Sequence, residues 1–238
     1  MIRAKIASKI LFFFDYFQQK KIYIFLKKKI KNNCILIDVG AHHGETIKNF
    51  KKYFNTSEIH SFEASGINFK VLNNKYSNQI DHKIFLNNFG LSNEKKIHKI
   101  KQLQESSSTT ISRINENSKY FKKKMRILGT EKSEYFKEIE INLETFDNYC
   151  SLKKLNKIDL LKIDTEGHEM CVLKGCKKTL KFINFIYFEH HYDDMLDKGY
   201  TFSDINNFLK NNGFKKIYKS KMYFRKTFEY VYQNSNHK

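Results

Sequence analysis

The sequence predicts an α/β fold: a mainly parallel sheet with helices on both faces, an antiparallel edge hairpin and an additional N-terminal helix. Two observations predict it. Short continuous apolar runs alternate with helix-like stretches from Cys34 to Asn211, a pattern typical of a parallel sheet buried on both faces. The 238 residues are 40% hydrophobic and 15% aromatic, which excludes a disordered chain and suffices for the core of one medium-sized domain.

Strands are expected where apolar residues run without interruption, and helices where they recur at helical spacing. This predicts a closing edge hairpin from residues 214–219 and 222–233. Residues 104–137 show neither pattern, and a stretch of this length suggests a lid, a binding insertion or a disordered segment. The remaining expected strands are 34–39, 58–63, 83–92, 96–103, 138–146, 159–164 and 183–190, and the expected helices are 45–54, 68–76, 168–180 and 203–211.

The N-terminal residues 1–33 are expected to form a basic amphipathic helical segment ahead of a main domain at 34–238. Packing on the main domain is the favoured interpretation of its apolar stripe, and peripheral contact of residues 1–30 with anionic lipid is the alternative. The longest apolar run, Ile10–Phe14, is far too short to span a bilayer, and no signal-peptide pattern follows, so we expect a cytoplasmic protein. The stripe consists of Ile6, Ile10, Phe13 and Phe17.

The net charge of +19 raises the possibility of a nucleic-acid partner. The chain has no Pro and no Trp, and its lysines are spread throughout, so a generally basic surface is the favoured reading and nucleic acid stays open but not favoured. The four cysteines form no CxxC pair and have no histidine at metal-ligand spacing, so we expect no metal bound through cysteine.

The first strand ends in a loop with the sequence Asp-Val-Gly-Ala-His-His-Gly, which we interpret as a cofactor loop. In open α/β sheets, ligands bind at the carboxyl ends of the strands. Gly40 and Gly44 allow the backbone to approach a ligand closely. The loop lacks the GxGxxG spacing of dinucleotide binders, and Asp38 favours a cationic, phosphate-free ligand. S-Adenosylmethionine fits that description.

The second strand ends in Glu63, one strand–helix–strand unit after Asp38. An acidic side chain at this point can accept hydrogen bonds from ribose hydroxyls. A helix cap for Asp38 and a surface position for Glu63 are the structural alternatives, but the glycine loop at this spacing favours a cofactor site.

The densest group of ionisable residues follows the strand at 159–164. Asp164, Glu166, His168 and Glu169 lie within six residues, and neighbouring like charges raise carboxyl pKa values in a way that suits proton abstraction. Capping of the next helix is the structural alternative. The following strand ends in Glu-His-His, and we consider His190 a proton carrier or a structural hydrogen-bonding group.

These motifs resemble the FkbM-type methyltransferases. The resemblance rests on DVGAHHG, FEAS, NNFGLSN, LLKIDTEGHEMCVLKG and FEHH, which occur in this order over roughly residues 34–192. It implies a class I methyltransferase (Rossmann-like) fold, S-adenosylmethionine as the cofactor, and a sugar, glycan or small-molecule hydroxyl as the acceptor. The sequence departs from the family pattern at His42, where an Asn is usual, and at Ala64, where a Pro is usual.

The resemblance also implies roles for individual residues. Glu63 would hold the ribose, and Asn88 and Gly90 would lie near the adenine. Asp38, Gly40 and Gly44 would line the methionine end, and Ala41 and His42 in the same loop are also expected to contact the cofactor. Asp164, Glu166 and His168 would face the methyl group and the acceptor.

The expected reaction is transfer of a methyl group to an oxygen, which needs a base for the hydroxyl proton. His168 or Glu166 is the expected base, with Asp164 orienting the base or the acceptor. Mg²⁺ dependence stays open, since Asp164 with other carboxylates is able to hold that ion. An RNA methyltransferase, prompted by the charge and the aromatic tail, and a non-catalytic scaffold or membrane-surface protein are the alternatives.

Overall fold

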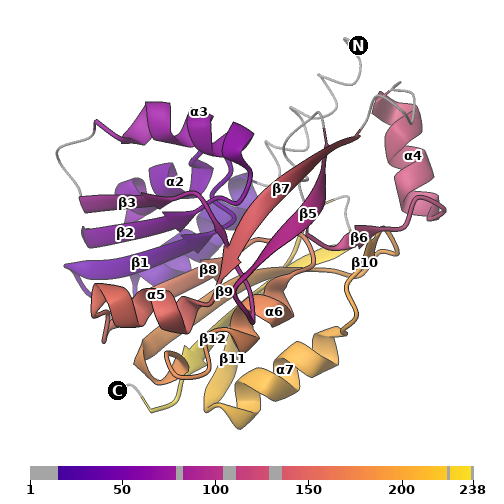
Figure 1. The fold of residues 1–238 in the computed structure, drawn as a ribbon. Helices are drawn as coiled ribbons and strands as arrows, with labels where there is room; N and C mark the ends of the chain where they lie inside the picture. Colours follow the sequence, from indigo (N-terminus) through magenta and orange to yellow (C-terminus); the bar gives the residue numbers. More distant parts are fainter. Residues whose placement is uncertain (1–15, 79–82, 104–110, 129–135, 224–225, 237–238) are drawn as a thin grey trace.

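A seven-stranded sheet forms the centre of the protein, whose computed structural model describes residues 16–78, 83–103, 111–128, 136–223 and 226–236 (Figure 1). In spatial order the strands are β11 (Phe214–Lys221), β12 (Thr227–Asn234), β9 (Ile183–His191), β8 (Ile158–Ile163), β1 (Cys34–Val39), β2 (Thr56–Phe62) and β3 (Lys83–Asn87).

The direction of the strands agrees with the prediction of a mainly parallel sheet with an antiparallel edge hairpin. Strands β3, β2, β1, β8 and β9 pair in parallel. Strand β12 lies between β9 and β11 and is antiparallel to both. Because β1 pairs with β2 on one side and β8 on the other, the ends of these three strands meet at one edge.

Helices cover both faces of the sheet (Figure 1). One apolar core contains the helix at residues 16–27, α2 (Glu45–Tyr53) and α3 (Gly66–Tyr76). The other contains α5 (Phe146–Lys153), α6 (Glu169–Lys174) and α7 (Phe202–Asn211). Side chains that alternate along each strand supply both cores: in β1, Leu36 belongs to the first and Ile37 to the second.

The described part of the N-terminal segment is a helix packed against the sheet. Tyr23 and Leu26 are fully buried, and the Tyr23 ring lies edge-on to Tyr187 of β9, with ring centroids 6.1 Å apart. Phe17 of the predicted apolar stripe is 40% exposed, while Ile6, Ile10 and Phe13 lie outside the described residues. Within the described ranges, no helix has the length and apolarity needed to cross a bilayer.

A second layer of strands stands at the carboxyl edge of the main sheet. Strands β4 (Gly90–Leu91), β5 (Lys96–Leu103) and β7 (Phe136–Glu144) form a three-stranded sheet in the order β4-β7-β5. The stretch predicted as an insertion, 104–137, contains described structure: β6 (Arg113–Ile114), which pairs with β10 (Leu196–Asp197), and helix α4 (Lys119–Leu128).

The helix predicted over residues 168–180 is shorter in the structure, because α6 ends at Lys174. Beyond the end of α6, the backbone is held by Asp147 of α5. Its carboxylate accepts hydrogen bonds from the amides of Lys178 and Thr179 at 3.0 and 2.8 Å. A contact 31 residues away in sequence thus adds to the local turn hydrogen bonds, such as that from the Thr179 amide to the Cys176 carbonyl. A short 3-10 turn, Leu180–Phe182, leads into β9.

Candidate functional site

Asp38, at the end of β1, is fully buried, and neither of its carboxylate oxygens has a hydrogen-bond partner in the described structure. Burial raises the pKa of Asp38 to about 7, and the nearby Lys162 opposes that rise. A buried carboxylate without donors is unfavourable unless a ligand supplies them. Asp38 therefore fits a ligand that carries a cationic hydrogen-bond donor.

The loop after β1 is held between the ends of β2 and β8. The amides of Gly40 and Ala41 donate to the Phe62 carbonyl at 3.0 and 2.9 Å. Gly40 has a φ of +86°, and a Cβ at this position would lie 1.9 Å from the Asp164 carbonyl oxygen. Only glycine therefore fits between the two strand ends.

Glu63 fixes the same loop from the end of β2. One of its carboxylate oxygens accepts from the amide of His42 at 2.8 Å and the other from the amide of Ser65 at 2.9 Å. Burial raises the pKa of Glu63 against these hydrogen bonds, which lower it. Each oxygen retains a lone pair, so Glu63 is able to position the loop and still accept from a ligand.

The structure accounts for His42, the departure from the usual Asn. His42 has a φ of 47°, a left-handed conformation in which Asn, Asp and His are enriched. Its ring stacks on His43 with centroids 3.7 Å apart, and its Nδ1 lies 3.4 Å from Glu45. These three side chains bring potential metal ligands within 4.8 Å of one another, but Glu45 is already engaged by the His42 ring and the His43 amide.

Asn88 and Gly90 lie beyond the end of β3 and have different surroundings. The Asn88 amide donates to the Glu63 carbonyl at 3.0 Å, which joins the ends of β2 and β3. At Gly90, a Cβ would lie 2.8 Å from Leu143 and 3.2 Å from Ala64. Gly90 is thus needed for close packing of the second layer of strands against the main sheet.

A buried group of charges lies at the ends of β8 and β9. Lys162 donates to Asp164 at 2.9 Å. The His191 Nε2 lies 3.1 Å from Glu166 and 3.3 Å from Glu189. Burial alone would lower the pKa of His191, but Glu166 and the other carboxylates raise it well above its ordinary value. We call Glu166, Glu189 and His191 the strand-end triad.

The structure brings Asp164 and Glu166 to this region but gives His168 and His190 other partners. His168 precedes α6 and lies 3.0 Å from the Ser92 hydroxyl. His190 contacts aromatic rings, among them Tyr192 with centroids 4.8 Å apart. Burial lowers the pKa of both histidines to about 4, so both are neutral at pH 7.

The sequence analysis singled out His190, whereas His191 and Glu189 face Glu166. Alternate side chains of a strand point to opposite faces, so positions 189 and 191 share one face and His190 lies on the other. Because side chains alternate between the two faces of β9, the sequence alone could have indicated that Glu189 and His191 lie on the same face. No comparable signal marks Lys162, whose burial depends on the strands on either side.

Glu169 shapes the loop that presents Glu166. Its Oε1 accepts from the Thr165 amide at 3.2 Å, the Thr165 hydroxyl at 3.0 Å and the Gly167 amide at 3.0 Å, and the Tyr200 hydroxyl donates to its other oxygen. Glu166 itself has a φ of 51°. The dense acidic sequence thus separates into one structural carboxylate, Glu169, and two that remain at the site, Asp164 and Glu166.

The sheet order, the inserted antiparallel strand β12 and the glycine loop at the end of β1 define a class I methyltransferase. The chain belongs to the FkbM methyltransferase family: residues 38–216 match the model of the methyltransferase FkbM domain. Family membership and fold confirm the predicted methyltransferase class, with S-adenosylmethionine as the cofactor. A search of curated proteins finds no significant match.

Solved structures share this fold at low sequence identity. An FkbM methyltransferase from Methylobacillus flagellatus is 14% identical with a TM-score of 0.52, and the alignment covers 84% of this chain and 44% of that chain. An rRNA methylase from Streptococcus thermophilus is 9% identical with a TM-score of 0.51, covering 91% and 96%. A Streptococcus mutans methyltransferase in complex with S-adenosylhomocysteine is 10% identical with a TM-score of 0.50, covering 91% and 97%.

Proposed function

We propose that this protein transfers the methyl group of S-adenosylmethionine to a hydroxyl oxygen of a sugar, glycan or similar small molecule. The observation that supports the proposal is the proximity of two different charged groups: the unpaired Asp38 carboxylate of β1 and, across the adjoining strands, the strand-end triad. Asp38 pairs in register with Lys162 of β8, which donates to Asp164. One group suits a cationic cofactor and the other suits removal of a proton.

The cofactor contacts follow from the donors and acceptors that are present. Asp38 would accept from the amino group of the methionine moiety, and the loop Gly40–Gly44 would lie along that moiety. Glu63 would accept from the ribose hydroxyls, and Asn88 would border the adenine. When bound, the cofactor supplies an electrophilic methyl group on a cationic sulfur.

Glu166 is the base that the geometry favours. Its side chain is 18% exposed, compared with 11% for Glu189, so it is the carboxylate of the triad that an acceptor reaches more readily. Its carboxylate lies 3.1 Å from the His191 Nε2. With the cofactor bound as the source of the methyl group, the Glu166 carboxylate would take up the proton that the acceptor hydroxyl loses on methylation. Asp164, held by Lys162, would orient the acceptor.

Two variants separate cofactor binding from proton removal. We expect Asp38→Ala to weaken S-adenosylhomocysteine binding by at least about tenfold in calorimetry, since a charge-assisted hydrogen bond is lost. Glu166→Gln should bind normally but transfer labelled methyl groups about a hundredfold or more slowly, the usual contribution of a general base. Glu94→Gln, at an exposed carboxylate paired with Lys96, serves as the control.

The substrates for this assay are a panel of sugars, glycans and RNA with labelled S-adenosylmethionine, with and without a chelator. Normal cofactor binding by Asp38→Ala would show that the loop assignment is wrong. Wild-type turnover by Glu166→Gln would exclude it as the base and leave His168 as the alternative from the sequence. Transfer to no hydroxyl in the panel would contradict the proposed reaction.

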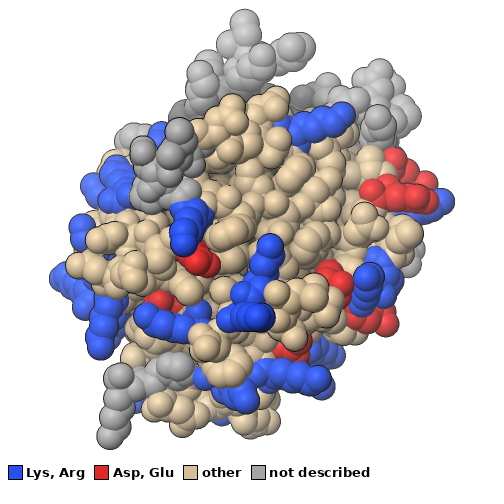
Figure 2. Space-filling view, turned by 60° about the vertical axis from the view of Figure 1, so that its left-hand side comes forward, with Lys and Arg blue, Asp and Glu red and all other residues tan. Residues whose placement is uncertain are grey.

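RNA methylation is the second candidate, and the net charge of +19 favours it. Figure 2 shows many Lys and Arg side chains on the left and lower parts of one face, with a broad uncharged area above its middle. Binding through phosphates would weaken steeply with salt, because each phosphate contact releases counterions. RNA binding with a steep salt dependence, together with methylation of RNA but not of sugars, would support RNA methylation as the function.

A further inference from the structure

A row of ionisable side chains crosses the middle of the main sheet on one face. Asp38 of β1, Lys162 of β8 and Tyr187 of β9 are partners in register across these parallel strands, so their side chains lie on the same face. Neighbouring strands are about 4.8 Å apart. Lys162 therefore lies between the unpaired carboxylate of the cofactor loop and a buried phenol.

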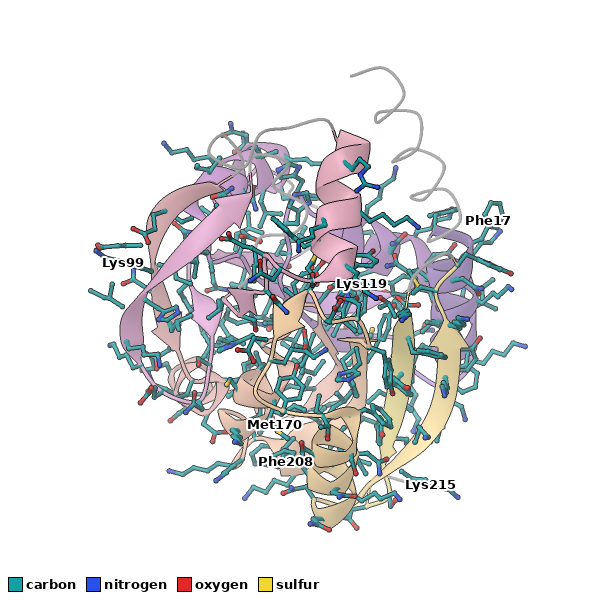
Figure 3. The ribbon with its side chains drawn as sticks, turned by 90° about the vertical axis from the view of Figure 1, so that its right-hand side faces the viewer. Phe17, Lys99, Lys119, Met170, Phe208 and Lys215 are labelled. Atoms are coloured by element: carbon teal, nitrogen blue, oxygen red, sulfur yellow. The ribbon has the colours of Figure 1, made fainter. Side chains whose placement is uncertain are left out.

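The N-terminal helix covers this row and excludes water from it. Figure 3 shows that helix, labelled at Phe17, on the opposite side of the sheet from Met170 of α6. The Lys162 side chain is 5% exposed, and its ammonium group lies 5.9 Å from the centre of the Tyr187 ring. A charge buried in this way is weakly screened, so it acts strongly on the charges beside it.

Two carboxylates share this one cation. Lys162 donates to Asp164 at 2.9 Å, whereas the two buried oxygens of Asp38 have no hydrogen bond of normal geometry. Among the groups that act most strongly on Asp38, Lys162 is the cation. The other groups that act on Asp38 or Lys162 are Glu45 and Thr46 of α2, Tyr76 of α3 and Tyr23 of the N-terminal helix. The site without its cofactor thus has fewer positive than negative charges.

We propose that Lys162 is a positioning residue that holds Asp38 ready for the amino group of the cofactor and, through the same ammonium group, fixes Asp164 on the acceptor side. The inference rests on the proposed contact between Asp38 and the cofactor. When the ammonium group of the methionine moiety binds Asp38, two cations face two carboxylates, and Lys162 is left to Asp164. Cofactor binding thus fixes the side chain that would orient the acceptor, and Lys162 acts through the two carboxylates without contacting the cofactor.

The test measures the affinity of the full-length protein for two probes by calorimetry across the neutral pH range. S-Adenosylhomocysteine carries the amino group, and methylthioadenosine lacks the whole amino-acid moiety. In the wild-type protein, S-adenosylhomocysteine should bind more weakly as the pH falls below about 7, where Asp38 takes up a proton. Binding of methylthioadenosine should not depend on pH in this range.

Lys162→Met and Asp164→Asn should shift the pH dependence in opposite directions, because Lys162 lowers the pKa of Asp38 and Asp164 raises it. In Lys162→Met, we expect the loss of affinity to begin about one to three pH units higher, with about tenfold or more weaker binding of S-adenosylhomocysteine at neutral pH. In Asp164→Asn it should begin about one pH unit lower. Lys162→Arg retains the charge and should lie closer to the wild type than Lys162→Met.

Lys157→Met is the matched control, because it removes an exposed lysine whose ammonium lies 3.6 Å from Asp159, at the start of β8. It should leave the affinities for both probes as in the wild type. General damage to the site would weaken methylthioadenosine as well, whereas the proposed role leaves its affinity unchanged in every variant. If Lys162→Met does not fold, the direction of the shift in Asp164→Asn decides.

Shifts in the same direction in the two variants, or no shift in Asp164→Asn, would overturn the inference and leave the proposed contact of Asp38 with the cofactor standing. A flat wild-type profile for S-adenosylhomocysteine would contradict that contact, and the inference with it. Methylthioadenosine binding with the same pH dependence as S-adenosylhomocysteine would do the same, because the titrating group would then not be the partner of the amino group.

Discussion

At Asp38, folding removes a carboxylate from water and leaves both oxygens without a hydrogen bond of normal geometry, with only the nearby Thr46 hydroxyl and Lys162 to favour its charge. Such a group lowers the stability of the free protein and is retained where a ligand completes it. The buried Lys162 on the neighbouring strand limits the cost by its charge. Asp38 therefore lowers the stability of the cofactor-free protein, and a bound cofactor that donates to its carboxylate would restore it.

Cofactor affinity should therefore depend on pH near neutrality. The pKa of Asp38 is raised from 3.8 to about 7, so the folded protein binds this proton more tightly than the unfolded chain does. Its contribution to stability is complete below pH 3.8 and is lost as the pH rises through about 7. Affinity for S-adenosylhomocysteine should fall by up to about tenfold for each pH unit below 7, because the ligand ammonium group requires the carboxylate.

Calorimetric titration at several pH values measures this dependence, with Asp38→Asn as the comparison. The Asn variant has no proton to lose at this position, so its affinity should be weaker and nearly flat with pH. A flat profile in the wild-type protein would contradict the ionised role of Asp38.

Residue types and spacing predicted the cofactor side of the site more completely than the catalytic side. The placement of Asp38, Gly40 and Glu63 at adjacent strand ends follows from the strand–helix–strand unit. The roles assigned to these residues stay predictions. To decide which of His190 and His191 lies at the site, one must know which face of the sheet each side chain is on. That depends on the register of β9 against β8 and β12, which the sequence does not give directly.

At the scale of single elements, the loop after β1 is the most constrained connection. Its backbone passes very close to the end of β8. The Asp164 carbonyl occupies the position that the Cβ of any other residue at position 40 would need. Gly199 offers a matched comparison, since it also has a positive φ, of +66°, but has no atom within 4 Å of its Cβ position.

Gly40→Ala should destabilise the protein more than Gly199→Ala. Left-handed backbone alone costs about 1–2 kcal/mol for a residue with a Cβ, which is the effect expected at position 199. At position 40 the clash adds strain and separates β1 from β8, so we expect a loss above about 3 kcal/mol and weaker cofactor binding. Urea unfolding of both variants measures the difference, and equal losses would show that the loop is free to move.

Elements whose ends are set by local sequence were predicted closely, and those set by distant contacts were not. Strand β1 has the predicted bounds, and α7 begins at Phe202, one residue before the prediction. Helix α6 stops early because Asp147 binds the backbone that follows it. The segment 104–137 contains α4 and β6, and the pairing of β6 with β10 depends on residues more than eighty positions later.

For the whole molecule, two separate cores on opposite faces hold the sheet in place. The helix at residues 16–27 contributes Ile22, Tyr23 and Leu26 to one of them. These side chains lie outside the predicted apolar stripe, so the interpretation of that stripe as a packing surface stays a prediction. The strands and most helices of the main sheet were predictable because they depend on apolar periodicity, which the sequence carries directly. Helix α5 was not predicted, and the strand expected over residues 83–92 is divided into β3 and β4.

Leu26→Ala should lower the free energy of unfolding by about 2–5 kcal/mol, as expected for truncation of a fully buried leucine. Ile24 lies on the same helix and is 41% exposed, so Ile24→Ala should change the free energy by about 0.5 kcal/mol or less. Thermal or urea unfolding compares the two. Equal effects would show that this helix does not depend on the main domain.

The pairing of β1 with β8 has a consequence for biosynthesis. Ile35 donates its amide to Asp159, 124 residues later, so one half of the cofactor site leaves the ribosome long before the other. An unfinished chain that ends before Ile158 lacks β8, the strand that closes the loop around Gly40. Ligand binding stabilises only the state that binds, so cellular S-adenosylmethionine would protect completed molecules from proteolysis and leave truncated ones exposed to it.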